Sequence, residues 1–315
     1  MKNVLILGSN LQTASKIARA LALGGLKVYR YKSLPVFEFY RDGVHYVCVP
    51  ALGHLFKLDT NGSKWYYPIF EAYWKAVSKE RKGIKKYVSA LKEVGSRASD
   101  YIIATDYDVE GDVIGYNVLR FVFRRNNARR MKFSALTKQD ILRAFNNLMP
   151  SLDFGQVNAG LARHYLDFFW GINLTRALTI AVSNASRKFK LISSGRVQSP
   201  TLYLVYKREL EIRNFKPQDF WVIKLLLAKD NLVFEAEYEG GKLFDKAKAM
   251  EIYSAVRNAS YARVLWVKEE VVSIPPLPPF NLTDLQAEAF KYFKFSPSKT
   301  LNLAEELYLD GLISY

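Results

Sequence analysis

The spacing of apolar and polar residues in the first half of the chain predicts alternating strands and helices. Residues 4–7 and 101–104 are short unbroken apolar runs, typical of strands buried on both faces of a sheet. Each run precedes a segment with apolar residues at helical spacing, over residues 13–23 and 110–122. Further elements are expected as strands at 27–31 and 131–133, a hairpin at 36–49, and helices over 79–93 and from Thr137 onward. This alternation predicts an α/β domain with a mainly parallel sheet over residues 1–150.

The second half changes pattern twice more. Residues 151–218 have a helical pattern with a break at 193–195, and residues 219–274 become strand-rich. Residues 275–315 begin with a proline-rich linker of polyproline type and continue into helical patterns. In these regions we expect strands at 221–227, 232–237 and 262–271, and helices at 246–256, 283–293 and 297–309. The chain is therefore predicted to be multidomain, α/β followed by α+β.

Composition limits the classes of partner and compartment. The 315 residues are 50% hydrophobic, and 46 Lys and Arg outweigh 30 Asp and Glu to give a net charge of +16. This excess favours nucleic acid as a partner, although a Lys-rich thermophile surface gives the same sign. Cys48 is the single cysteine, which excludes an internal disulfide and indicates a reducing compartment. No apolar run reaches the ~18 residues of a membrane span or has the form of a signal peptide, so we expect a cytoplasmic protein without membrane contact.

The strongest candidate for chemistry is an acidic stretch directly after the second buried run. Asp106, Asp108 and Glu110 alternate at the predicted carboxyl end of a strand. Carboxylates in this position can converge on a hard cation such as Mg²⁺, at the edge where open α/β sheets bind ligands. An acidic first helical turn, favoured by the helix dipole, is the alternative explanation.

Three weaker patterns are compatible with binding to a phosphate backbone. Residues 193–202 place Arg196, Gln198 and Ser199 around a glycine turn before a helix, which could bind a phosphodiester or only cap the helix. Arg163 and Asp167 have the spacing of an ordinary surface ion pair. Basic residues form two runs, which are either phosphate guides or solvated faces: Lys79, Arg81, Lys82, Lys85 and Lys86, then Arg120, Arg124, Arg125, Arg129, Arg130 and Lys132. No P-loop is present, so no nucleotide cofactor is expected.

Together and in this order, the motifs resemble those of the type IA DNA topoisomerases, close in style to the topoisomerase III group. The matching segments are 106–112 to the acidic DxDxE motif of the Toprim domain, 53–55 to GHL, 162–167 to the ARRxxD helix, 195–202 to GRVQSPTL, and 275–315 to the run into the catalytic tyrosine. The resemblance implies a Rossmann-like Toprim domain followed by part of the topoisomerase core. It also implies ATP-independent cleavage and religation of single-stranded DNA through a 5′-phosphotyrosine, with strand passage that relaxes negative supercoils.

By the same resemblance, Tyr315 is the nucleophile, and Asp106, Asp108 and Glu110 hold Mg²⁺, with Glu110 also catalytic. The residues that would position DNA are His54, Arg163, Asp167, Arg196, Gln198 and Ser199. A monomer that acts at the nucleoid is expected.

The sequence departs from the family pattern at several positions. Ser9 and Asn10 occupy the positions of the usual catalytic glutamate and lysine, Val109 replaces an arginine, and the sequence stops at Tyr315. Serine cannot replace a carboxylic acid in protonating the leaving oxygen, and asparagine carries no charge. Two readings remain: a piece of a longer enzyme, or a degenerate homologue that binds single-stranded DNA without relaxing it. A Toprim primase or nuclease is a weaker third reading, because the segment before Tyr315 argues against it.

Overall fold

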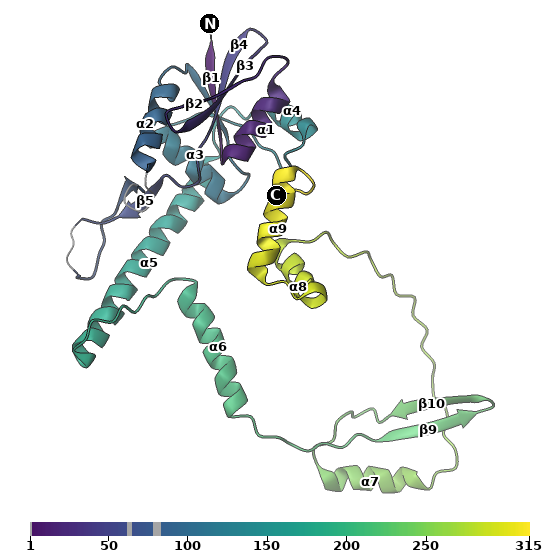
Figure 1. Ribbon diagram of the computed structural model, residues 1–315. Coiled ribbons are helices and arrows are strands. Elements are labelled where there is room, and N and C mark those ends of the chain that lie inside the picture. Colours follow the sequence, from purple (N-terminus) through teal and green to yellow (C-terminus); the bar gives the residue numbers. More distant parts are fainter. Residues whose placement is uncertain (1, 62–64, 78–82) are drawn as a thin grey trace. The chain divides into compact units, whose positions relative to one another are not determined.

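The computed structural model describes residues 2–61, 65–77 and 83–315. The chain forms two compact units, Met1–Ser199 with Phe280–Tyr315, and Pro200–Pro279 (Figure 1). Each unit is described separately. In the described part of the chain, no helix is both long and apolar enough to cross a membrane.

The centre of the first unit is a mixed sheet. Within the described residues it has six strands in the order β2-β3-β4-β1-β7-β8. Their bounds are β1 Asn3–Gly8, β2 Lys27–Tyr31, β3 Leu34–Arg41, β4 Val44–Pro50, β7 Asp100–Ala104 and β8 Arg129–Arg130. β1 pairs in parallel with β4 and β7, and β7 pairs in parallel with β8, whereas β2, β3 and β4 form an antiparallel meander. The prediction of a mainly parallel sheet is confirmed.

Helices cover both faces of this sheet, and the alternation along β1 explains why. Leu5 and Leu7 pack on the side of α2 (Ile84–Gly95) and α3 (Val109–Phe121). Val4 and Ile6 pack on the side of α1 (Leu11–Leu21) and α4 (Lys138–Asn146). A strand buried on both faces needs apolar residues at every position, which is the pattern seen in the sequence.

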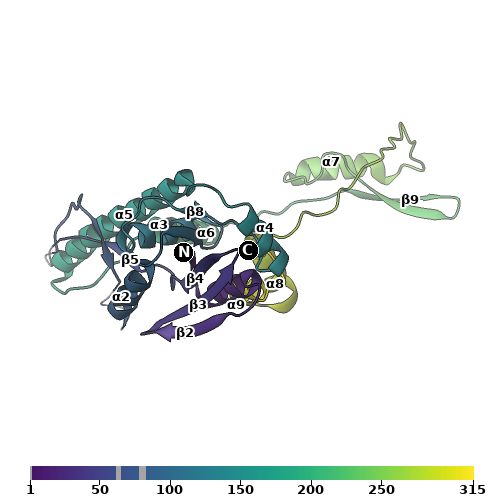
Figure 2. The same cartoon turned by 90° about the horizontal axis from the view of Figure 1, so that it is seen from above.

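The rest of the first unit is helical apart from a small hairpin. The hairpin pairs β5 (Phe56–Asp59) with β6 (Tyr73–Ala76), and the patterning did not predict it. α5 (Phe154–Ser186) is 33 residues long and contacts α3 (Figure 2). Gly160 permits this close approach, because a Cβ there would lie 2.4 Å from Cγ2 of Val113. Two further helices, α8 (Leu282–Phe293) and α9 (Pro297–Asp310), confirm the helical patterns at the end of the chain.

Two expectations for this unit need correction or restriction. The strand expected at 131–133 is β8 at Arg129–Arg130, because the Arg130 side chain binds the carbonyl oxygens of Met131 and Thr105, where a ladder would continue. The helix expected over 79–93 is described only from Ile84, and residues 79–82 lie outside the described residues.

The second unit contains most of one helix, a hairpin and a second helix. β9 (Lys224–Lys229) pairs antiparallel with β10 (Leu232–Glu237), and α7 is Lys246–Arg257. The chain enters this unit through α6 (Gln198–Arg213). The strand expected at 262–271 is wrong, because these residues join neither β9 nor β10 and leave Trp266 exposed. Residues with high strand propensity form a strand only where they can pair with the free edge of another strand.

Candidate active site

The acidic loop lies at the carboxyl edge of β1 and β7, where parallel sheets place ligand sites. Oγ of the buried Ser9 accepts a hydrogen bond from the backbone N–H of Asp106 at 2.8 Å. The side chain of Asn10 caps α1 by accepting from the Thr13 N–H at 2.9 Å. Both residues therefore support local structure at positions where the family pattern has an acid and a cation.

The start of α3 fixes the shape of the acidic loop. Asp108 is its N-cap, and Oδ1 of Asp108 accepts from the Gly111 N–H at 2.6 Å. A Cβ on Gly111 would lie 2.2 Å from the carbonyl oxygen of Asp106, so the turn requires glycine. The alternative explanation, an acidic first helical turn, also holds, because Glu110 and Asp112 lie in the first turn of α3. Capping uses Oδ1 of Asp108 and leaves Oδ2 for other partners.

A buried ion pair stabilises the acidic loop. Nε of Arg130 lies 2.7 Å from Oδ1 of Asp112, and both side chains are 0% exposed. The guanidinium also donates to four carbonyl oxygens, those of Ile103, Thr105, Asp106 and Met131. Both sequence readings of the basic run, a phosphate guide or a solvated face, are wrong for Arg130. The available signal was weak: Arg130 directly precedes the apolar Met131, at the start of the strand expected at 131–133.

The rest of the two basic runs divides between exposed and paired side chains. Arg129 pairs with Asp100 at 2.7 Å, and Lys132 pairs with Asp153 at 3.3 Å. The exposed members within the described residues are Lys85, Lys86, Arg120, Arg124 and Arg125. The remaining three, Lys79, Arg81 and Lys82, lie outside the described residues.

Two tyrosines reach the acidic loop from the end of the chain. The Tyr315 hydroxyl donates to Oδ2 of Asp108 at 2.6 Å, and the Tyr308 hydroxyl donates to Oδ1 of Asp106 at 3.3 Å. The Tyr315 N–H also donates to the carbonyl oxygen of Ser134 at 2.7 Å. Tyr308 is 4% exposed and Tyr315 is 58% exposed, so only Tyr315 presents its ring to solvent. The sequence reasoning missed Tyr308 because nothing in its spacing shows that α9 packs on the sheet.

Burial and like charge raise the pKa of the groups in this corner. Burial, together with the Asp108 carboxylate that accepts its hydrogen bond, raises the pKa of Tyr315 above its ordinary value. Burial and the charge of Asp106 raise the pKa of Tyr308. Burial also raises the pKa of Asp106, and the charge of Asp108 acts in the same direction. A cation at this edge would stabilise the two ionised carboxylates.

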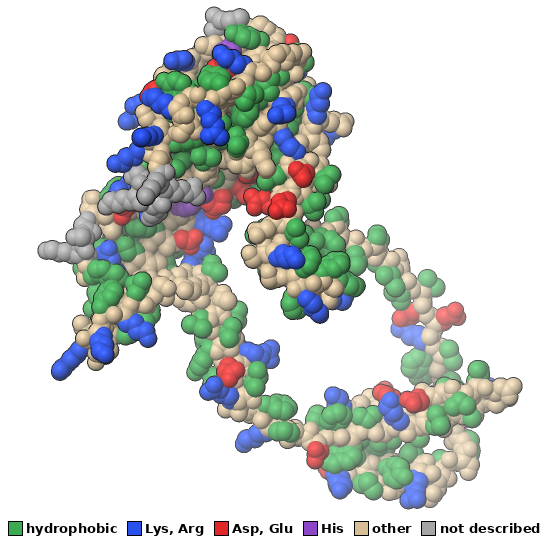
Figure 3. Space-filling model, in the orientation of Figure 1, with side chains coloured by type: hydrophobic (Ala, Val, Ile, Leu, Met, Phe, Trp, Pro, Cys, Tyr) green, Lys and Arg blue, Asp and Glu red, His purple; other side chains and the backbone are tan. Residues whose placement is uncertain are grey.

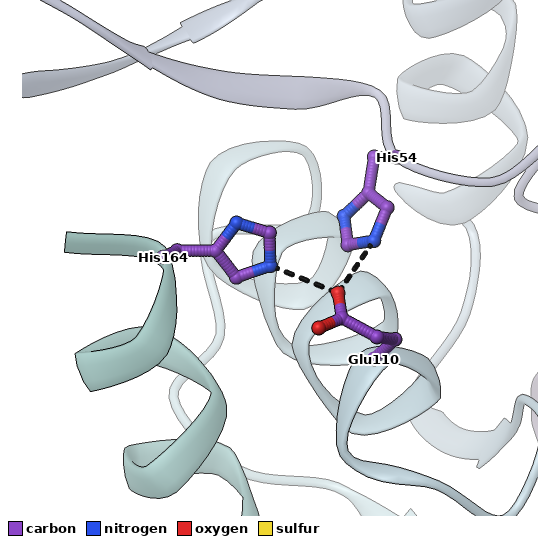
Figure 4. Close-up of side chains that lie close together, drawn as sticks. All are labelled: His54, Glu110 and His164. Atoms are coloured by element: carbon purple, nitrogen blue, oxygen red, sulfur yellow. Dashed lines mark hydrogen bonds and ion pairs between the residues drawn. The ribbon is translucent and has the colours of Figure 1, made fainter. Parts of the chain in front are cut away.

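The Glu110 carboxylate points toward two histidines (Figure 4). Its Oε2 lies 3.1 Å from Nε2 of His54 and 3.0 Å from Nε2 of His164, on α5. Its Oε1 lies 3.5 Å from Nη1 of Arg163. Burial, followed by the neighbouring charge of His164, lowers the pKa of His54. Sequence reasoning noted His54 but did not predict that His164 would meet it.

Acidic and histidine donors gather on one side of the sheet domain (Figure 3). Over residues 2–61, 65–77 and 83–315, the one group of three such side chains with donor atoms all within 4.8 Å is His54, Glu110 and His164. Asp106 and Asp108 face the tyrosines instead. The oxygen donors of Asp106, Asp108 and Glu110 still suit Mg²⁺ chemically, and they share one edge of the sheet.

The segment after α5 is linked to this edge through charged side chains. Nε of Arg196 lies 2.5 Å from Oδ1 of Asp167, and this contact lowers the pKa of Asp167. Arg163 lies 3.8 Å from Asp167 and, at its other end, contacts Glu110. The glycine turn itself is closed by two side-chain contacts: Ser199 Oγ to Ser194 Oγ at 2.7 Å and Gln198 Nε2 to Ser193 Oγ at 3.3 Å.

The sheet is mainly parallel, an acidic loop lies at its carboxyl edge, and a tyrosine hydroxyl from the end of the chain contacts that loop. Two family models match the chain: Toprim domain over residues 12–136, and DNA topoisomerase over residues 151–315. The chain belongs to the type IA DNA topoisomerase family.

Individual relatives agree with this assignment. DNA topoisomerase 1 of Methanocaldococcus jannaschii is 42% identical over 99% of this chain and 40% of its own length. DNA topoisomerase 1 of Pyrococcus furiosus is 42% identical over 98% of this chain and 29% of its own length. The solved full-length topoisomerase I of Thermotoga maritima matches with a TM-score of 0.64 and 28% identity, over 99% of this chain and 48% of that structure. The chain thus spans less than half the length of these proteins.

Proposed function

We propose that the chain carries the DNA-cleaving centre of an ATP-independent type IA topoisomerase, with Tyr315 as the nucleophile. One observation supports this most: the exposed Tyr315 presents its hydroxyl 2.6 Å from the Asp108 carboxylate at the acidic edge. A phenol with a raised pKa needs a base to take its proton as it attacks phosphorus, and the Asp108 carboxylate already accepts its hydrogen bond.

The proposed step exchanges one phosphodiester for another. The Tyr315 oxygen bonds to phosphorus, its proton passes to Asp108, and the bond from phosphorus to the 3′-oxygen breaks. The leaving 3′-oxygen takes a proton from water, because Ser9 offers no carboxylic acid at this edge. The tyrosyl phosphodiester then reacts with the 3′-hydroxyl in reverse. Because the number of phosphodiester bonds is unchanged, no nucleotide is consumed.

A divalent cation belongs to this proposal. Asp106, Asp108 and Glu110 would hold Mg²⁺, and their oxygen donors fit it. Bound there, Mg²⁺ would supply positive charge to the phosphate. The chain itself contributes the capped loop that positions Asp108, and the buried Arg130 that fixes the Asp106 backbone beside it.

DNA would follow the charged side chains from the glycine turn to the acidic edge. In this proposal, Arg163 and Arg196 contact phosphates and Asp167 orients both guanidinium groups. The other proposed strand-positioning residues are His54, Gln198 and Ser199. We propose a preference for single strands, a monomer, no nucleotide cofactor, and a location at the nucleoid, where DNA is found.

A second candidate function is single-strand binding without relaxation. The structural roles of Ser9 and Asn10 favour it, because both side chains are engaged locally and supply neither an acid nor a cation.

The polarity of the covalent product tests the proposed function. The protein is incubated with Mg²⁺ and single-stranded oligonucleotides that are labelled at the 3′ or the 5′ end, then denatured and separated on a gel. A 5′-phosphotyrosine retains the downstream fragment, so the 3′ label should migrate with the protein and the 5′ label should not. Transfer of the 5′ label instead would contradict the proposed chemistry. If neither label transfers while the oligonucleotide still binds, the second candidate is supported.

A further inference from the structure

The cleavage proposal includes His54 and Glu110 but does not use the convergence of two histidines on the Glu110 carboxylate. Each histidine directs Nε2 at the same oxygen of Glu110, at 3.1 and 3.0 Å (Figure 4). Arg163 contacts the other oxygen of that carboxylate, so its charge does not occupy the space between the imidazoles. Three donors from three separate elements therefore surround one point.

The distances between these donor atoms are close to those between the ligands of a small tetrahedral ion. With Zn–N and Zn–O distances of ~2.0–2.2 Å, neighbouring ligands of a tetrahedral zinc lie ~3.3–3.5 Å apart. The two nitrogen-to-oxygen distances are slightly shorter than this, and all donor atoms lie within 4.8 Å. Small rotations of the partly exposed side chains would open the cluster to hold an ion.

The donor types discriminate between metals. Mg²⁺ prefers oxygen and keeps most of its waters, whereas two imidazoles and a carboxylate suit Zn²⁺ and Co²⁺. An aromatic side chain borders the cluster, because the Trp74 ring centroid lies 5.6 Å from that of His164. The remaining coordination position would be open to water or to a phosphate oxygen.

We propose that His54, Glu110 and His164 form a binding site for a transition metal of the Zn²⁺ class, separate in its histidines from the Mg²⁺ site but sharing Glu110. The role of Glu110 as a Mg²⁺ ligand rests on the proposed function. If both ions need Glu110, their binding is mutually exclusive. An ion held by the histidines takes Glu110 from Mg²⁺, so Zn²⁺ should inhibit DNA cleavage in competition with Mg²⁺.

One feature of the cluster limits the expected affinity for the metal. The buried Nδ1 of His54 has no hydrogen-bond partner in the described structure, whereas ligating histidines usually donate their second nitrogen to a carbonyl or carboxylate. Absence of such a partner typically lowers affinity ~10–100-fold. We therefore expect reversible binding that a chelator removes without unfolding the protein.

Cobalt absorption provides a test that does not depend on DNA. Co²⁺ is titrated into the whole chain, and its visible absorption band is followed for wild type, His54→Gln, His164→Gln and His45→Gln. The chain has three histidines, so His45, on β4 and outside the cluster, is a matched control. Far-UV circular dichroism verifies the fold of each variant, and the two cluster variants test the site independently of each other.

We expect an intense tetrahedral band that Zn²⁺ displaces, lost in both cluster variants and kept in His45→Gln. The loss of affinity should exceed the ~10–100-fold typical of an outer-shell partner. No band in wild type, or a band unchanged in His54→Gln and His164→Gln, would overturn the site. If the band behaves as expected but no oligonucleotide is cleaved, only the proposed function fails. If cleavage occurs without the band, only the metal site fails.

Discussion

Removal of Arg130 is the sharpest test of how this chain supports its acidic loop. The side chain is fully buried, pairs with Asp112 and donates to four backbone carbonyls, including that of Asp106. In Arg130→Met, the Asp112 carboxylate remains in the interior without a partner. Breaking such a pair from one side costs ~3–5 kcal/mol, a large share of the ~5–15 kcal/mol stability of a typical domain.

Two further variants separate the contributions to this cost. In Asp112→Asn, the guanidinium keeps all four carbonyl acceptors, so we expect a smaller loss of ~1.5–3 kcal/mol, typical of one hydrogen bond to a charged group. Arg129→Met is the matched control, since Arg129 is the adjacent residue and pairs with Asp100 at the same 2.7 Å distance. That pair is about one-third exposed, and surface pairs of this kind are worth ~0–1 kcal/mol.

Urea unfolding followed by far-UV circular dichroism gives the order of the three variants. The urea concentrations at the midpoint of unfolding are compared between variants with equal m values, so that a shift in midpoint reports a change in the free energy of unfolding. The predicted loss of unfolding free energy is largest for Arg130→Met, intermediate for Asp112→Asn and smallest for Arg129→Met. Equal losses for Arg130→Met and Arg129→Met would refute the buried network as the support of the loop.

Three further predictions concern DNA, metal and catalysis. Affinity for single-stranded oligonucleotides, measured by fluorescence anisotropy, should fall steeply as salt rises and exceed that for duplex; affinity independent of salt would contradict binding to phosphates. Asp108→Asn should weaken Mg²⁺ binding, measured by calorimetry. It should also lower the pKa of Tyr315 in a spectrophotometric titration, because the carboxylate favours the protonated phenol. An unchanged Mg²⁺ affinity and an unchanged pKa would exclude the contacts of Asp108 with the ion and with Tyr315. Ser9→Glu with Asn10→Lys should raise the cleavage rate by up to ~10²–10⁴-fold if the acid is limiting, and cost ~0.5–2 kcal/mol through the lost α1 cap. No gain in rate from this pair would show that the acid is not the limiting group.

The parts of the fold that the sequence predicted are those governed by local rules. The apolar run of β1 is buried on both faces, and Thr137 caps the helix that it was expected to open. The strand wrongly expected at 262–271 has the right residue types but no partner edge among the described strands. Strand formation depends on distant residues, so composition alone could not decide it.

The same limit applies to the candidate site. Asp106, Asp108 and Glu110 could be identified from the sequence because they follow a buried strand. The side chains that contact them, such as Tyr308 and His164, could not. The contact of Glu110 with His164 joins residues 54 positions apart and depends on how closely α5 approaches α3. Likewise, the pairing of Asp112 with Arg130 depends on the order of strands in the sheet. These contacts come from packing, which the spacing of residues does not encode locally.

The most direct measurement of the central claim is covalent capture of a 3′-labelled single-stranded oligonucleotide by wild type, Tyr315→Phe and Tyr308→Phe. Tyr308 is the matched control, because its hydroxyl also contacts the acidic loop but its ring is 4% exposed, against 58% for Tyr315. We predict that wild type and Tyr308→Phe form the labelled adduct in Mg²⁺ and that Tyr315→Phe forms none. An adduct that persists in Tyr315→Phe, or its absence from wild type, would contradict the assignment of Tyr315 as the nucleophile of this chain.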